Sequence, residues 1–151
     1  MGYVRSMGFQ FAETMSGAVE WSAQPGVRQP LSFEVTATAS STREHLRDGK
    51  ARLSGAIHAP PLAPTAAVEG VITIRLFGER IIRYELAFTA ADGKPYTLVG
   101  QKDIRWLSPT RSFTYLPAEI FDDAHRRVGT CETTFNVERD LWSFVRSFRP
   151  A

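Results

Sequence analysis

The feature that most constrains the fold of this chain is a two-residue alternation of apolar and polar side chains between positions 31 and 137. In one segment, Ile72 and Ile74 alternate with Thr73 and Arg75. A period of two places successive side chains on opposite faces of a β-sheet. Many short strands separated by turns predict an antiparallel barrel or sandwich. A closed sheet of this size can surround a pocket.

We therefore expect an all-β, mainly antiparallel fold: a lipocalin-like β-barrel with two short helices, one of them C-terminal. The length of 151 residues predicts a single domain over residues 1–151. Proline-rich segments and Pro-Gly pairs predict loops over residues 22–30 and 60–69. The expected strands cover residues 9–21, a segment from Leu31 onward, and residues 51–59, 70–77, 80–90, 96–104, 112–121 and 126–136.

The alternation also predicts a register around a two-residue hairpin turn at Gly78-Glu79. Arg75, Arg83 and Glu85 should face outward. The residues expected to face inward are Ile72, Ile74, Leu76, Ile82, Tyr84, Leu86 and Phe88.

The two helices are predicted from a capping pattern and from a change of period. Ser41 to Glu44 has the form of a capping box, which predicts a short helix over about residues 42–48. Near the C-terminus the apolar residues recur at helical spacing, which predicts a helix over about residues 139–149 with one apolar face. That face consists of Leu141, Phe144, Val145 and Phe148.

Composition excludes several classes of function. The net charge is only +2 and the basic residues are dispersed, so we expect no nucleic-acid partner. A single cysteine, Cys131, rules out a disulfide within the chain and fits a reducing, cytoplasmic location. The start of the chain lacks the apolar run of a secretory signal, and no stretch approaches the length of a membrane span. The excess of arginine over lysine suggests a bacterial source.

Two stretches of the sequence resemble a known family. One is Phe11–Gly17, and the other begins at Tyr84–Phe88 and continues through Asp92–Lys102. They resemble a β-rich domain that accompanies bacterial oxidoreductases of the cholesterol-oxidase-like, glucose-methanol-choline type. The resemblance implies an association with apolar, sterol-like or lipid-like molecules. It does not imply the oxidase chemistry, because the chain has no G-x-G-x-x-G motif leading into a helix.

The sequence supplies no recognisable metal or nucleophile motif. His45, His58 and His125 fall on different segments without the spacing of a metal site, so we expect no metal and no cofactor. Cys131 lies mid-strand, where a cysteine usually acts as a small apolar residue rather than as a nucleophile. The aromatic residues, Trp21 and Trp106 among them, are expected in the core.

Two charges fall on predicted apolar faces. Glu13 aligns with Phe11 and Met15, and Lys102 aligns with Leu98. An isolated buried charge is costly, so these side chains should pair with each other or face a wet cavity. In the structural interpretation they form an ion pair. In the functional interpretation Glu13, Lys102 and Tyr84 reach a ligand-binding pocket, and the uncharged segment 60–68 covers its mouth.

Three functions remain open from the sequence. The first is binding of an apolar small molecule, such as a lipid, sterol or polyketide-like compound, in a barrel pocket of at least about 300 Å³. The second is a cofactor-free cyclase or isomerase acting on such a molecule, as in allene-oxide-cyclase-like barrels. The third is a packed scaffold or interaction domain. No catalytic residue is assigned, no membrane span is expected, and a homodimer is left open.

Overall fold

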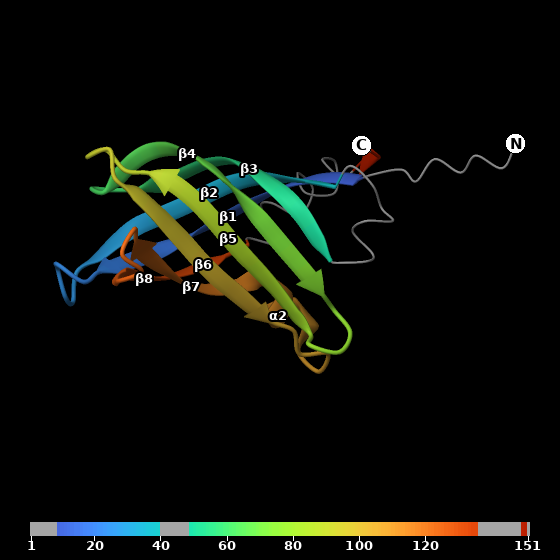
Figure 1. Cartoon of the computed structure of the whole chain (residues 1–151). Coiled ribbons are helices and arrows are strands. Elements are labelled where there is room, and N and C mark those ends of the chain that lie inside the picture. The colour runs from blue at the N-terminus through green and yellow to red at the C-terminus, as the bar shows by residue number, and fades with distance from the viewer. Residues whose placement is uncertain (1–8, 40–48, 136–148, 151) are drawn as a thin grey trace, which may run out of the picture.

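The computed structural model describes residues 9–39, 49–135 and 149–150, and these form a closed antiparallel β-barrel (Figure 1). Each of eight strands pairs with the next in sequence, and the last pairs with the first to close the barrel. The strands are β1 (Phe9–Trp21), β2 (Arg28–Ala39), β3 (Lys50–Ala59), β4 (Ala63–Arg75), β5 (Ile81–Thr89), β6 (Pro95–Asp103), β7 (Tyr115–Asp122) and β8 (Arg127–Thr134). A two-residue strand, β9 (Arg149–Pro150), pairs with the start of β1.

The barrel has two ends with different connections. The turns after β1, β3, β5 and β7 form what we call the hairpin end, at residues 22–27, 60–62, 90–94 and 123–126. The opposite end carries the β4–β5 turn, residues 76–80, and a single described helix, α2 (Pro109–Thr114). We call it the α2 end. Figure 1 shows the β4–β5 turn and α2 close together at this end.

Helix α2 lies where the barrel wall opens. The β6–β7 ladder runs from Tyr96 paired with Asp122 to Gly100 paired with Ala118. Beyond Gly100, β6 continues alongside β5 and β7 continues alongside β8, so the two strands separate toward the α2 end. Pro109 occupies the first turn of the helix, where a missing N–H costs no hydrogen bond.

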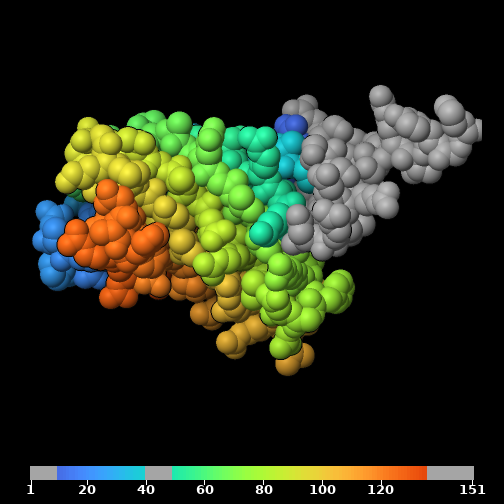
Figure 2. Space-filling model, in the orientation of Figure 1, coloured from blue at the N-terminus to red at the C-terminus, as the bar shows by residue number. Residues whose placement is uncertain are grey.

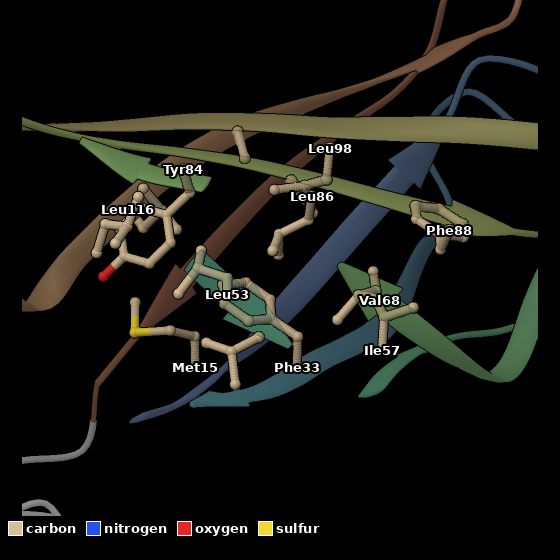
Figure 3. Close-up of a cluster of buried hydrophobic side chains, with 14 of the residues drawn as sticks. Met15, Phe33, Leu53, Ile57, Val68, Tyr84, Leu86, Phe88, Leu98 and Leu116 are labelled. Atoms are coloured by element: carbon tan, nitrogen blue, oxygen red, sulfur yellow. The ribbon is translucent and has the colours of Figure 1, made fainter. Parts of the chain in front are cut away.

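The middle of the barrel is filled by side chains. Inward positions from all eight barrel strands form one continuous apolar core. Figure 3 shows part of this core. Phe33 from β2 and Tyr84 from β5 meet across the interior with ring centroids 6.1 Å apart. The largest fully buried side chains are Tyr84, Phe33, Met15, Leu31, Ile57, Ile72, Leu86, Leu98, Leu116, Ile120, Val19 and Val68.

The predicted register of β4 and β5 is confirmed. Ile72, Tyr84 and Leu86 are buried, whereas Arg75 and Glu85 are exposed. Ile74 and Leu76 also face the core but are only half-buried, because they lie near the open α2 end.

Glycines let three strands approach their neighbours closely. A Cβ built on Gly17, Gly55 or Gly70 would lie 1.8–1.9 Å from a backbone carbonyl oxygen of the adjacent strand. Each glycine falls between two buried residues in the inward series of its strand, β1, β3 or β4, although Gly17 and Gly55 are themselves exposed. The neighbouring strands can approach this closely only where no side chain is present.

Several sequence predictions of boundaries were wrong. Strand β2 begins at Arg28 rather than Leu31, and β4 begins at Ala63, so most of the expected 60–69 loop is strand. Cross-strand pairing outweighs the proline content there, since Pro64 is the only proline of β4. The β4–β5 turn is longer than two residues, and residues 112–114 belong to α2 rather than to a strand.

The two predicted helices lie outside the described residues, apart from position 149. That residue belongs to β9, so a helix over residues 139–149 does not extend to its predicted end.

Candidate functional site

A pocket of about 540 Å³ opens at the α2 end. Inward residues of β1, β4, β5 and β6 line it from the barrel, and α2 lines it from the opening in the wall. Most of the lining is apolar, with the polar groups gathered on a few side chains. The lining residues are Phe11, Glu13, Ile72, Ile74, Leu76, Ile82, Tyr84, Lys102, Pro109, Thr110, Phe113, Thr114 and Phe135.

Three polar side chains from three strands meet in this pocket. The Tyr84 hydroxyl of β5 donates a hydrogen bond to Glu13 Oε1 of β1, with an oxygen–oxygen distance of 2.5 Å. Lys102 Nζ of β6 lies 3.6 Å from the same carboxylate oxygen and 5.2 Å from the centroid of the Tyr84 ring. Because β1 does not pair with β5 or β6, these contacts cross the barrel interior. The sequence prediction that Glu13, Tyr84 and Lys102 lie together is thus matched by their geometry.

Burial shifts the pKa values of Lys102 and Tyr84. The Lys102 side chain is only 3% exposed and that of Glu13 is 12% exposed. Burial lowers the pKa of Lys102, while the nearby Glu13 carboxylate acts in the opposite direction. Burial also raises the pKa of Tyr84 well above its ordinary value, and the charge and hydrogen bond of Glu13 raise it further. Tyr84 therefore stays a protonated hydrogen-bond donor.

The three side chains form a compensated polar group inside apolar surroundings. Lys102 balances the charge of Glu13, and Tyr84 fills a further hydrogen-bonding position on the carboxylate. Within the described part of the chain, no buried side-chain nitrogen or oxygen lacks a hydrogen-bond partner. The geometry satisfies the structural interpretation of an ion pair and also places that pair at a pocket. Ligand binding by these residues stays a prediction.

Helix α2 contributes lining residues that the sequence interpretation missed. Phe113 and Thr114 were expected in a strand, and Pro109 and Thr110 were assigned no role. The signal that could have identified the helix is Ser108-Pro109, since proline is favoured in the first turn of a helix.

The proposed cover for the pocket was wrong. The segment 60–68 leads into and forms part of β4, which starts at the hairpin end. Pro61 and Leu62 line a different pocket of about 730 Å³ there, together with Trp21 and Tyr96. They are separated from Lys102 by the packed middle of the barrel, so they cannot cover the pocket at the α2 end.

The surroundings of Cys131 and His58, two other candidate residues, fit a structural role rather than a catalytic or metal-binding one. Cys131 is buried in β8, and burial with the nearby charges of Glu119 and Glu132 raises the pKa of its thiol to about 12. Such a thiol is a poor nucleophile at neutral pH. His58 Nε2 lies 3.5 Å from Glu34 Oε1 on the barrel exterior. Among the described residues, no group of three or more acidic, histidine or cysteine side chains is arranged to hold a metal.

Comparison with known proteins supplies no relative. No protein-family model, curated protein or solved structure matches this chain. The resemblance of Phe11–Gly17 and Asp92–Lys102 to the oxidoreductase-associated domain stays a prediction. In the described part of the chain, no helix has the length and hydrophobicity needed to cross a membrane.

Proposed function

We propose that this protein binds an apolar small molecule, in a lipocalin-like manner, in the pocket at the α2 end. The observation that carries the proposal is a compensated Glu13–Lys102 pair at an otherwise apolar pocket that is open at the barrel mouth. Eight-stranded barrels of this size are able to hold one small ligand. Here the filled middle restricts the ligand to one end, so it would enter only part of the barrel.

The volume and lining of the pocket suit such a ligand. About 540 Å³ lies within the usual range of roughly 300–1,000 Å³ for small-molecule sites. Ile74, Ile82 and Phe113 offer aliphatic and aromatic contacts along the pocket. Covering these side chains with an apolar ligand would stabilise the complex by about 25 cal/mol for each Å² removed from water.

The charge balance of the site selects the polar end of the ligand. Glu13 already neutralises Lys102, so a ligand carboxylate would compete with Glu13 and leave one negative charge unbalanced. A neutral oxygen fits better. A hydroxyl group could accept a hydrogen bond from Lys102 and donate one to Glu13. We therefore favour a lipid or sterol-like molecule that carries a hydroxyl or carbonyl group.

Displacement of the fluorescent probe N-phenyl-1-naphthylamine tests this proposal with unmodified protein. We expect 1-dodecanol to displace the probe at lower concentration than dodecanoate does. Lys102→Met should weaken dodecanol binding roughly ten- to hundredfold, the effect of losing a hydrogen bond to a charged group. Lys94→Met is the matched control, because Lys94 is an exposed lysine at the hairpin end.

A pocket-filling variant protects the test against misfolding of Lys102→Met. Ile74 is half-buried and lines the pocket, so Ile74→Trp should reduce probe binding while the fold persists. Equal binding of the probe by Ile74→Trp and the unmodified protein would contradict the proposal, as would tighter binding of dodecanoate than of dodecanol.

A cyclase or isomerase is a second candidate, and one observation favours it. Lys102 combines a lowered pKa with a position beside Glu13, which is the kind of arrangement that supports proton transfer. In that case Lys102 would donate a proton to a substrate oxygen and Glu13 would accept one. Conversion of a bound compound by the unmodified protein, lost in Glu13→Gln, would favour this candidate over simple binding. The packed middle of the barrel is what supports the scaffold alternative.

A further inference from the structure

Exposed large apolar side chains gather at the α2 end. Leu107 is fully exposed, Phe77 is 85% exposed and Trp106 is 47% exposed. Only one other large apolar side chain of the described residues, Val27 at the hairpin end, is comparably exposed. The prediction that Trp106 lies in the core is therefore wrong. We call Phe77, Trp106 and Leu107 the apolar tip.

The apolar tip is formed by two loops held together. Ile104 N donates a hydrogen bond to Arg80 O at 2.9 Å, which joins the loop after β6 to the β4–β5 turn. The rings of Phe77 and Trp106 stack with centroids 6.1 Å apart and an interplanar angle of 23°. Figure 2 shows the turn, in yellow-green, and the loop, in gold, protruding at the lower right of the molecule.

Four arginines lie close in sequence to the apolar tip. Arg75 and Arg80 lie on either side of Phe77, and Arg105 and Arg111 lie on either side of Trp106 and Leu107. Arg75 pairs with Glu79 at 2.7 Å, and Arg80, Arg105 and Arg111 are exposed. The acidic residues of the same segments are Glu79 and the exposed Asp103, so four arginines face two carboxylates and positive charge exceeds negative charge near the tip. Arginine binds phosphate oxygens well because its planar group can donate two parallel hydrogen bonds.

We propose that the apolar tip docks this protein onto the surface of a lipid bilayer that contains anionic headgroups. Exposed aromatic rings and a leucine with arginines nearby in the same two loops match what an interfacial membrane contact requires: apolar insertion with phosphate contacts beside it. Protruding loops suit insertion between headgroups better than they suit a flat protein interface. The charge complementarity favours anionic lipid over a second copy of the chain, whose tip would carry the same positive charge.

The position of the tip also links it to the pocket. Phe113 packs against Trp106, with ring centroids 5.9 Å apart, and lines the pocket itself. Docking would therefore place the pocket beside the membrane surface. The docking proposal does not require a ligand and goes beyond the proposed function, so either can fail alone.

Vesicle co-sedimentation tests the docking. The probes are vesicles of phosphatidylcholine alone and of phosphatidylcholine with about a third phosphatidylglycerol. We expect binding to the anionic vesicles that weakens as salt rises. Phe77→Ser with Leu107→Ser should weaken it at least tenfold, and so should Arg80→Gln with Arg105→Gln. Val27→Ser, an exposed apolar residue at the hairpin end, is the matched control and should bind normally.

Tryptophan fluorescence provides a second readout. Emission should shift to shorter wavelength on binding and be quenched by brominated lipid, and Trp106→Phe should remove most of this quenching. Unchanged vesicle binding by Phe77→Ser with Leu107→Ser, or no binding to either vesicle, would overturn the proposal. Dimerisation without lipid that the same substitutions abolish would instead assign the tip to a second copy of the chain.

Discussion

The ion pair between Glu13 and Lys102 supplies a quantitative prediction about stability. At 3.6 Å and an effective dielectric constant of about 20, the Coulomb attraction is about 4–5 kcal/mol. Much of that value offsets the cost of removing two charges from water. Removing one partner leaves the other charge buried, so Lys102→Met and Glu13→Gln should each lower the free energy of unfolding by about 3–5 kcal/mol.

The double variant separates the pair from its two members. Without either charge, no uncompensated ion remains, and the amide oxygen that replaces the Glu13 carboxylate can still accept the Tyr84 hydrogen bond. We therefore expect Glu13→Gln with Lys102→Met to lose at least about 2 kcal/mol less than the sum of the single losses. Urea unfolding followed by circular dichroism measures all four proteins. Additive losses, within about 0.5 kcal/mol, would refute the coupling of these side chains across the barrel.

Three further predictions concern the packing and the pKa shifts. In thermal unfolding, Gly70→Ala should destabilise the protein far more than Gly78→Ala. A Cβ on Gly70 would lie 1.8 Å from a backbone oxygen, whereas a Cβ on Gly78 would meet no atom and would be strained only by the positive φ of that residue. The pKa of Tyr84 is raised, so its stabilising contribution is complete below about pH 10, the ordinary pKa of tyrosine, and is lost as pH rises further. Tyr84→Phe should therefore make the alkaline loss of unfolding free energy less steep. Native Cys131 should react with a thiol reagent at about pH 8 only as fast as the protein unfolds, since its pKa is about 12 and it is buried; rapid native labelling would contradict this.

The barrel and part of its site could be predicted because they follow from the two-residue alternation of apolar and polar side chains. Alternation fixes which face of a strand is buried, and this placed Ile72 and Tyr84 inward correctly. The same reasoning identified Glu13 and Lys102 as charges on apolar faces. The cost of burying them alone implied that they pair, as they do at 3.6 Å.

The errors arose where tertiary contacts override local signals. Prolines near position 60 suggested a long loop, but cross-strand pairing begins at Ala63. Helix α2 covers the opening between β6 and β7, a feature of barrel closure that no local pattern records. Trp106 was assigned to the core because aromatic residues are usually buried, and composition alone does not show which loop tips are exposed.

The central claim is that the pocket at the α2 end binds an apolar molecule, and methyl NMR tests it most directly. Isoleucine-labelled protein places reporters both at the pocket, in Ile74 and Ile82, and in the filled barrel, in Ile57 and Ile120. On titration with 1-dodecanol, we predict saturable shifts at Ile74 and Ile82 and little change at Ile57 and Ile120. An absence of saturable shifts, or shifts confined to Ile57 and Ile120, would contradict the account.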